Sequence, residues 1–216
     1  MIIPNSIDIN LFKSNTTINK KTSHKILYFG TLIRKKGVLE LAYIFNEVVK
    51  TQPQAQLILL GNDSHDIQTQ SKSTYALMQS LFSKTANQQH HFLGKVSYRE
   101  VKNYIDEAQV VVFPSFAEAL PVSWLEAMAM GKIVITSNIG WANEIIIHEK
   151  NGFMCDPKNH KAFADNIIEV LNGNINLEKI SKNAKSSVVK NFSCQKTAVE
   201  HVEFYKQILE NEYRKS

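Results

Sequence analysis

The chain has 216 residues, of which 44% are hydrophobic and 21% are charged, and this composition excludes a disordered or low-complexity protein. Lys and Arg number 25 against 20 Asp and Glu, so the mild net charge of +5 gives no reason to expect nucleic-acid binding. With two cysteines, Cys155 and Cys194, and no Cys-x-x-Cys pair, we expect neither a disulfide framework nor a cysteine-based zinc site. The sequence contains no apolar run of membrane-span length and no signal-peptide pattern, which favours a cytoplasmic protein.

Short apolar runs alternate with segments of helical periodicity along the chain. In chain order, the pattern predicts a strand at 25–30, a helix at 38–49, a strand at 56–61, a helix at 74–83, a strand at 91–94, a helix at 97–107, a strand at 109–114, a helix at 121–130, a strand at 132–136, a helix at 142–148, an extended piece at 152–154, and helices at 158–172, 177–189 and 193–212. This alternation indicates an α/β fold, a Rossmann-like parallel sheet with helices on both faces. We expect residues 62–73 to form a surface loop, and the first fourteen residues to be a linker outside the core.

The loop after the first predicted strand, residues 30–37, carries three cations between two glycines. Ligands of parallel α/β sheets bind beyond the carboxyl ends of the strands, and the helix that follows this loop would present its N-terminus there. Arg34 and Lys36 would add positive charge that pairs with phosphate. A solvated basic loop is the other interpretation. The loop matches neither the Gly-x-Gly-x-x-Gly fingerprint of dinucleotide-binding proteins nor a Walker loop.

Two glutamates follow the apolar run at 109–114: Glu118 in the loop at the strand end and Glu126 inside the next helix. A carboxylate at position 118 can accept hydrogen bonds from sugar hydroxyls, or it can serve only as a charge complement to the helix N-terminus. Glu126 lies among apolar residues, so it needs a partner if it is buried; otherwise it belongs to an exposed stripe of the helix. The turn between them offers a phosphate the backbone amides of Ala119, Leu120 and Val122, whereas Pro121 has no amide hydrogen.

Metal-binding patterns are missing from the sequence. It has no Asp-x-Asp pair and no cluster of His and carboxylate residues at ligand spacing. We therefore expect no metal site, and a bound diphosphate would be neutralised by Lys36, neighbouring cations and helix N-termini. His90 and His91 flank a predicted strand, and we interpret both as structural.

The ordered set of motifs resembles the C-terminal, donor-binding domain of the family 4 glycosyltransferases, which have the two-domain GT-B fold. The resemblance covers nearly the whole chain, and its most specific local signal is the pair Glu118 and Glu126, separated by seven residues. The other matching segments are the linker motif Ile3 to Asp8, Tyr28-Phe29-Gly30 with Lys36-Gly37, Leu59-Leu60-Gly61, Phe92-Leu93-Gly94, Glu144-Ile145-Ile146, and Asn151-Gly152-Phe153 with Asp156-Pro157.

The resemblance implies a role for each matching residue. Lys36 would hold the donor diphosphate and stabilise the leaving group, Glu118 would contact hydroxyls of the donor sugar, and these two are the implied catalytic residues. Glu126 would bind the ribose hydroxyls. The full implied donor-binding set is Gly30, Thr31, Arg34, Lys36, Lys95, Val96, Glu118, Ala119, Leu120, Pro121, Val122 and Glu126.

The implied donor-binding set includes residues for the nucleotide base and for a second contact with the phosphates. Backbone around Lys95 and Val96 would meet the nucleotide base. The Arg that often follows the first-strand glycine in the family is Thr31 here, and Arg34, on the same loop, is expected to replace it.

The resemblance also implies an activity. The family transfers a glycosyl group with retention at the anomeric carbon, without a metal or another cofactor. The donor is a nucleoside-diphosphate sugar, which family habit suggests is a UDP-sugar. Such enzymes often build surface polysaccharide at the inner membrane face.

The resemblance divides the chain into a linker at 1–22, a nucleotide-sugar-binding domain at 23–192, and a C-terminal helix at 193–216. That helix would cross to an N-terminal acceptor domain, which the sequence does not contain. We expect the chain alone to transfer little, and to need that domain or a partner chain. We also expect self-association through the exposed inter-domain face, and membrane contact only through a full enzyme.

Other interpretations stay open at this point. The chain could be a non-catalytic nucleotide-binding subunit that completes its site with a separate acceptor chain. It could also be another Rossmann-like protein, such as a nicotinamide-binding domain or a sugar-phosphate isomerase, or an α/β domain without a ligand. The missing glycines count against the nicotinamide-binding domain, and neither that class nor the isomerase explains the Glu118–Glu126 pair.

Overall fold

The computed structural model describes residues 3–13, 23–173 and 175–213, and its centre is a parallel sheet of six strands. In spatial order these are β3 (His90–Gly94), β2 (Gln56–Leu60), β1 (Lys25–Phe29), β4 (Val110–Phe113), β5 (Ile133–Ser137) and β6 (Phe153–Cys155). The chain builds outward from β1 in one direction and then returns to place β4 on its other side. This reversal creates the crevice at which open α/β sheets bind ligands.

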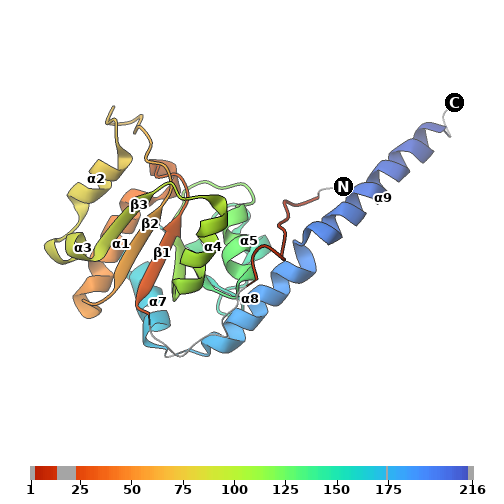
Figure 1. Cartoon of the computed structure of the whole chain (residues 1–216). Helices are drawn as coiled ribbons and strands as arrows, with labels where there is room; N and C mark the ends of the chain where they lie inside the picture. The colour runs from red at the N-terminus through yellow and green to blue at the C-terminus, as the bar shows by residue number, and fades with distance from the viewer. Residues whose placement is uncertain (1–2, 14–22, 174, 214–216) are drawn as a thin grey trace.

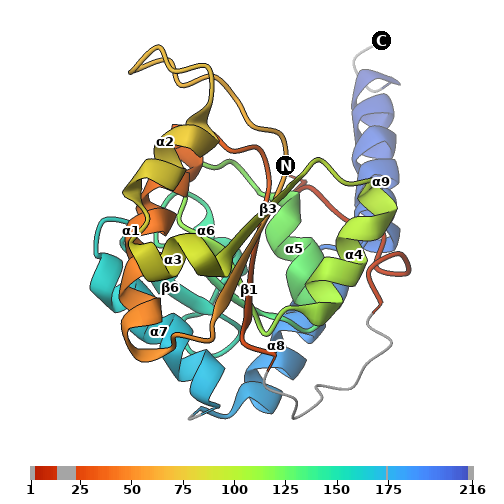
Figure 2. The ribbon, with the colours of Figure 1, turned by 60° about the vertical axis from the view of Figure 1, so that its left-hand side comes forward.

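Helices cover both faces of the sheet (Figures 1 and 2), so the predicted fold class is confirmed. One face is covered by α1 (Val38–Thr51), α2 (Thr74–Leu81), α3 (Lys84–Gln89) and α7 (His160–Asn172). The other face is covered by α4 (Tyr98–Glu107), α5 (Val122–Ala129) and α8 (Leu177–Asn191). Two short helices, η1 (Arg34–Lys36) and α6 (Ala142–Ile145), lie in loops, and α9 (Cys194–Tyr213) projects away from the sheet (Figure 1).

The strands at the reversal are buried on both faces. Every residue of β4 is buried, as are four of the five residues of β1, which explains why these sequences read as apolar runs instead of alternating ones. Phe29 ends β1 and Phe113 ends β4, and their rings meet edge to face with centroids 5.3 Å apart. The carboxyl ends of these two strands are therefore held together beneath the crevice.

The predicted strands and long helices are present, with bounds shifted by a few residues, but two helices differ from the prediction. α3 was not predicted because its sequence, KTANQQ, has no apolar periodicity; the hydroxyl of Ser83, which accepts from the amide of Ala86, is the local signal for its start. The helix predicted at 142–148 ends at Ile145. There Asn151 breaks it, since its side chain accepts from the amide of Ile147 and donates to the carbonyl of Ile145.

The prediction that the first fourteen residues lie outside the core is wrong for Ile7 and Phe12, which are 3% and 1% exposed. The amide of Ile7 donates to the carbonyl of Phe192, and its carbonyl accepts from the amide of Cys194, both at 3.0 Å. Segment 3–13 is thus tied to the junction of α8 and α9 (Figure 1). Residues 1–2 and 14–22 of the predicted linker, and 214–216 of the predicted last helix, lie outside the described residues.

The projecting helix α9 exposes apolar side chains, as its sequence pattern predicts. Val202, Tyr205 and Leu209 are each more than half exposed, and Ile208 is 40% exposed. Within the described ranges, no helix combines the length and the apolar character that a membrane span requires.

Candidate functional site

An open pocket of about 370 Å³ lies at the carboxyl ends of β1 and β4, where the strand order reverses. Its volume falls in the range of small-molecule sites. Five segments contribute its lining. The lining residues are Phe29, Gly30 and Thr31 at the end of β1, Lys36 of η1, Tyr98 and Val101 of α4, Glu118 and Pro121 of the loop after β4, and Val122, Ser123 and Glu126 of α5.

The pocket brings together most of the residues that the sequence singled out. The predicted residues that line it are Gly30, Thr31, Lys36, Glu118, Pro121, Val122 and Glu126. The predicted residues outside its lining are Arg34, Lys95, Val96, Ala119 and Leu120. Tyr98 lines the pocket and was not predicted.

Lys36 and Glu118 meet inside the pocket. The Lys36 ammonium lies 3.2 Å from Oε1 of Glu118, and the hydroxyl of Ser115 donates to the same oxygen at 2.9 Å. The two side chains are only 26% and 16% exposed, so solvent screens their attraction less than that of a surface pair. A cation and a carboxylate predicted from separate motifs are therefore within reach of one ligand.

The backbone around Lys36 is fixed by close packing. Gly37 has φ +67°, and a Cβ at this position would lie 1.7 Å from the carbonyl oxygen of Pro114, so only glycine fits. On the other side of the loop, the hydroxyl of Tyr28 donates to the carbonyl of Thr31 at 3.1 Å. Burial, together with the charge of Glu118, raises the pKa of Tyr28, which keeps this hydroxyl protonated as a donor.

Glu126 is buried, with 4% of the residue exposed, and this excludes the interpretation as part of an exposed helix stripe. The hydroxyl of Tyr98, from α4, donates to its Oε1 at 2.6 Å. Burial raises the pKa of Glu126, and the hydrogen bond from Tyr98 opposes this rise. Burial and the interaction with Glu126 raise the pKa of Tyr98 in turn, so the tyrosine stays a donor. Tyr98 uses one acceptor position of the buried Glu126 carboxylate, so the other positions stay available to a ligand.

The sequence predicts that Tyr98 starts a helix, but it does not predict the hydrogen bond between Tyr98 and Glu126. The capping box of Ser97 and Glu100 is present, and it starts α4 at Tyr98, beside the pocket. No local pattern connects Tyr98 with Glu126, because the two residues are 28 positions apart and lie on different helices.

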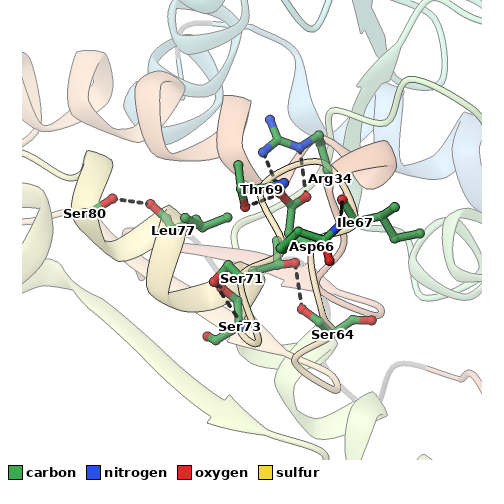
Figure 3. A network of polar contacts seen from close by, with 11 residues as sticks. Arg34, Ser64, Asp66, Ile67, Thr69, Ser71, Ser73, Leu77 and Ser80 are labelled. Carbon is green, nitrogen blue, oxygen red and sulfur yellow. Dashed lines mark hydrogen bonds and ion pairs between the residues drawn. The ribbon is translucent and has the colours of Figure 1, made fainter.

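Arg34 lies away from the pocket and is occupied by Asp66 (Figure 3). Its Nε and Nη2 donate to the two carboxylate oxygens of Asp66 at 2.9 and 2.8 Å. Thr69 donates to the same carboxylate through its hydroxyl and its amide. These donors hold the pKa of Asp66 well below its usual range. The structure thus gives no support to Arg34 as a replacement for the family's phosphate-binding Arg, because its guanidinium does not line the pocket and ties η1 to the loop at 62–73.

Two further observations concern other sites. In the part of the chain that the structure describes, no three His, Cys, Asp or Glu residues lie close enough together to hold a metal ion. A second cavity, of about 400 Å³, has among its lining residues Glu149, Lys150, Glu169 and Lys179, and it contains none of the residues that the sequence analysis selected.

Comparison with known proteins gives the family. The family described as "Glycosyl transferases group 1" matches residues 11–187. An uncharacterized glycosyltransferase from Methanocaldococcus jannaschii is 32% identical over 186 residues, which cover 86% of this chain and 45% of that protein. A capsular polysaccharide biosynthesis glycosyltransferase from Staphylococcus aureus is 25% identical over 201 residues, covering 88% and 50%.

Solved structures of glycosyltransferases share the fold. The structure of Anabaena HepE in complex with UDP and glucose superposes with a TM-score of 0.80 at 20% identity, covering 96% of this chain and 57% of that one. This chain spans about half the length of the relatives that it matches. The match over residues 11–187 includes the whole sheet and every residue that lines the pocket. The chain belongs to the glycosyl transferases group 1 family and has the fold of the C-terminal domain of a GT-B glycosyltransferase.

Proposed function

We propose that this chain is the donor-binding domain of a family 4 glycosyltransferase and that its pocket takes a nucleoside-diphosphate sugar, with UDP as the nucleotide. One observation carries the proposal: Lys36 of the basic loop and the glutamate pair Glu118 and Glu126, two motifs far apart in the sequence, converge on a single pocket at the strand reversal. The Anabaena neighbour, whose structure contains UDP and glucose, supports the choice of nucleotide.

Lys36 holds the diphosphate in this proposal. Its ammonium, together with the N-terminus of α5 at Val122, stabilises the negative charge that develops on the leaving phosphate. The pairing of Lys36 with Glu118 keeps the ammonium inside the pocket before the ligand arrives. Arg34 has no part in the phosphate site, since its guanidinium is bound to Asp66.

The two glutamates bind hydroxyl groups. Glu118 accepts hydrogen bonds from the donor sugar, and Glu126, buried deeper, accepts them from the ribose. Transfer proceeds with retention at the anomeric carbon, and the positive charge that a metal would supply comes from Lys36 and helix dipoles. We assign no nucleophile, because a front-side transfer with leaving group and acceptor on one face needs none.

The activity of the whole protein requires an acceptor-binding domain as well. We propose that this chain binds the donor and transfers little alone, because its pocket is open to solvent and admits water. A separate chain that supplies the acceptor half is the alternative arrangement, in which this chain acts as a nucleotide-binding subunit. The capsular relative supports a role in surface polysaccharide synthesis. The cytoplasmic face of the membrane as the place of that synthesis is part of our proposal.

A thermal-shift titration with UDP, GDP, ADP and NAD tests donor binding. A ligand at one hundred times its dissociation constant adds about 2.7 kcal/mol to the free energy of unfolding. We expect a rise in melting temperature with UDP, and a smaller rise in Lys36→Ala and in Glu126→Ala.

Lys35→Ala is the matched control, because Lys35 is the exposed neighbour of Lys36 in η1 and does not line the pocket. It should keep the full response to UDP. Absence of a shift with every nucleoside diphosphate at millimolar concentration would contradict the proposal, and a shift with NAD alone would favour a nicotinamide-binding protein.

A further inference from the structure

Glu126 can act on a ligand only if its carboxylate is held in place, and the structure shows what holds it. The side chain is buried in α5, and Oε1 accepts a 2.6 Å hydrogen bond from the hydroxyl of Tyr98. Both residues line the same pocket. A hydrogen bond between a hydroxyl and a charged carboxylate is among the stronger ones in proteins.

We propose that Tyr98 is a positioning residue of the donor site: its hydroxyl orients the Glu126 carboxylate so that the remaining acceptor sites face a ligand with two neighbouring hydroxyl groups. A carboxylate has about four acceptor positions on two oxygens. Tyr98 occupies one of them on Oε1, which leaves Oε2 and the second position of Oε1 for a vicinal diol. The inference rests on the proposed function, in which that diol belongs to the ribose.

Tyr98 is itself held from behind by the N-terminal segment. The ring of Phe12 meets the ring of Tyr98 edge to face, with centroids 5.6 Å apart, and Phe12 is 1% exposed. The capping box at Ser97 fixes the backbone at the start of α4. Phe12 therefore supports one side of the tyrosine ring and the capping box holds its backbone, while the residue as a whole is 55% exposed; the ring contact and the hydrogen bond to Glu126 are the two contacts that orient the hydroxyl.

The same N-terminal segment also contacts the loop that carries Glu118. The side-chain amide of Asn5 donates to the carbonyl of Leu120 at 3.1 Å. Segment 3–13 is thus attached to both walls of the pocket, to α4 through Phe12 and to the loop before α5 through Asn5. The role of segment 3–13 in this fold is therefore to support the site.

Isothermal titration of the full chain with UDP and with 2′-deoxy-UDP tests the proposal, using Tyr98→Phe. This variant removes the hydroxyl and keeps the ring that packs on Phe12. We expect UDP to bind about tenfold more weakly, as for the loss of one hydrogen bond to a charged group. Affinity for 2′-deoxy-UDP should change much less, because one of the two hydroxyls that use the oriented carboxylate is already missing.

Two further variants separate positioning from other roles. Tyr104→Phe removes a hydroxyl from the same helix at a residue that does not line the pocket, and it should leave both affinities unchanged. In a Glu126→Gln background, Tyr98→Phe should add little further loss, because the hydroxyl acts through Glu126.

Equal UDP affinity in Tyr98→Phe and Tyr104→Phe would overturn the inference, and so would tighter binding, which would make Tyr98 a competitor of the ribose. A wild-type chain that binds no nucleoside diphosphate would instead overturn the proposed function and the inference with it. The two failures are thus distinguished by the wild-type titration.

Discussion

Substitution of Gly37 tests whether close packing against Pro114 positions the loop at 30–37, which carries Lys36. A Cβ at this residue would lie 1.7 Å from the carbonyl oxygen of Pro114 and 2.6 Å from its carbon, whereas real Cβ contacts under 3.0 Å essentially never occur. Its φ of +67° adds the penalty of a left-handed conformation. In Gly37→Ala the end of η1 must therefore move away from the end of β4, and Lys36 must move with it.

Gly173 is the matched control, because it has nearly the same φ, +69°, but nothing lies within 4 Å of its Cβ position. Gly173→Ala should lower the free energy of unfolding by about 1–2 kcal/mol, the cost of the left-handed conformation alone. Gly37→Ala carries the same cost plus that of a backbone collision, about 1–3 kcal/mol for overpacking. The total expected loss is thus about 2–5 kcal/mol.

Urea unfolding of the two variants and the wild type measures these losses, and titration with UDP measures the effect on the site. Gly37→Ala should be the less stable variant and should bind UDP more weakly, while Gly173→Ala should bind it normally. Equal stability losses would show that the loop has room for a Cβ. They would refute the argument that close packing on Pro114 positions Lys36.

Three other predictions concern charge and surface. Glu118→Gln removes the anionic partner of Lys36, so UDP should bind as tightly as before or more tightly. The extra affinity for UDP-glucose over UDP should fall, because the variant loses the carboxylate that accepts from the sugar. Calorimetry with both ligands measures the two effects, and a weaker UDP complex would speak against the assigned roles. The pKa of Asp66 is lowered in the folded state. Asp66 therefore contributes its full stabilisation above about pH 4, the pKa of an aspartate in an unfolded chain, and this stabilisation is lost as the pH falls through the lowered pKa of the folded state. Urea midpoints of the wild type and Asp66→Asn should therefore differ at pH 7 and converge in acid; a constant difference would exclude this cause. The exposed apolar side chains of α9 predict that the chain associates with itself, and the double variant Val202→Ser and Leu209→Ser should reduce this association in sedimentation experiments without changing the melting temperature, since both side chains are more than half exposed. Unaltered association would place the contact elsewhere, and a monomeric wild type would refute the prediction.

The parts of the fold that the sequence predicts are those with short-range causes. The run VVVF predicts a strand buried on both faces, and β4 is such a strand. Ser97 and Glu100 predict the start of α4 by a capping box that the structure contains. Lys36 and Glu118 could be selected because their loops follow strand ends, and parallel strands bring their carboxyl ends to one edge; Glu126 could be selected because it is a carboxylate inside an apolar helix.

The parts that could not be predicted depend on contacts between distant residues. Arg34 and Asp66 are 32 positions apart, and nothing in the basic loop indicates that one of its cations is bound by a later loop. Phe12 was assigned to a linker because the first fourteen residues contain Pro4 and several Asn, yet tertiary packing buries it, with its ring against that of Tyr98. In both cases a residue distant in the sequence decides the role, and local composition does not indicate that residue.

These long-range contacts divide the cations of the loop at 30–37 by function. Arg34 is tied to Asp66, so η1 is attached to the loop after β2. Lys36 is paired with Glu118, which a ligand can replace with its own phosphate oxygens. In the proposed function, binding of a diphosphate releases Glu118 from Lys36 at the same time as the sugar arrives beside it. Lys36 then exchanges Glu118 for the phosphate, and Glu118 exchanges Lys36 for the sugar, in the same step. This exchange requires only side-chain movement, because both residues already lie in the pocket.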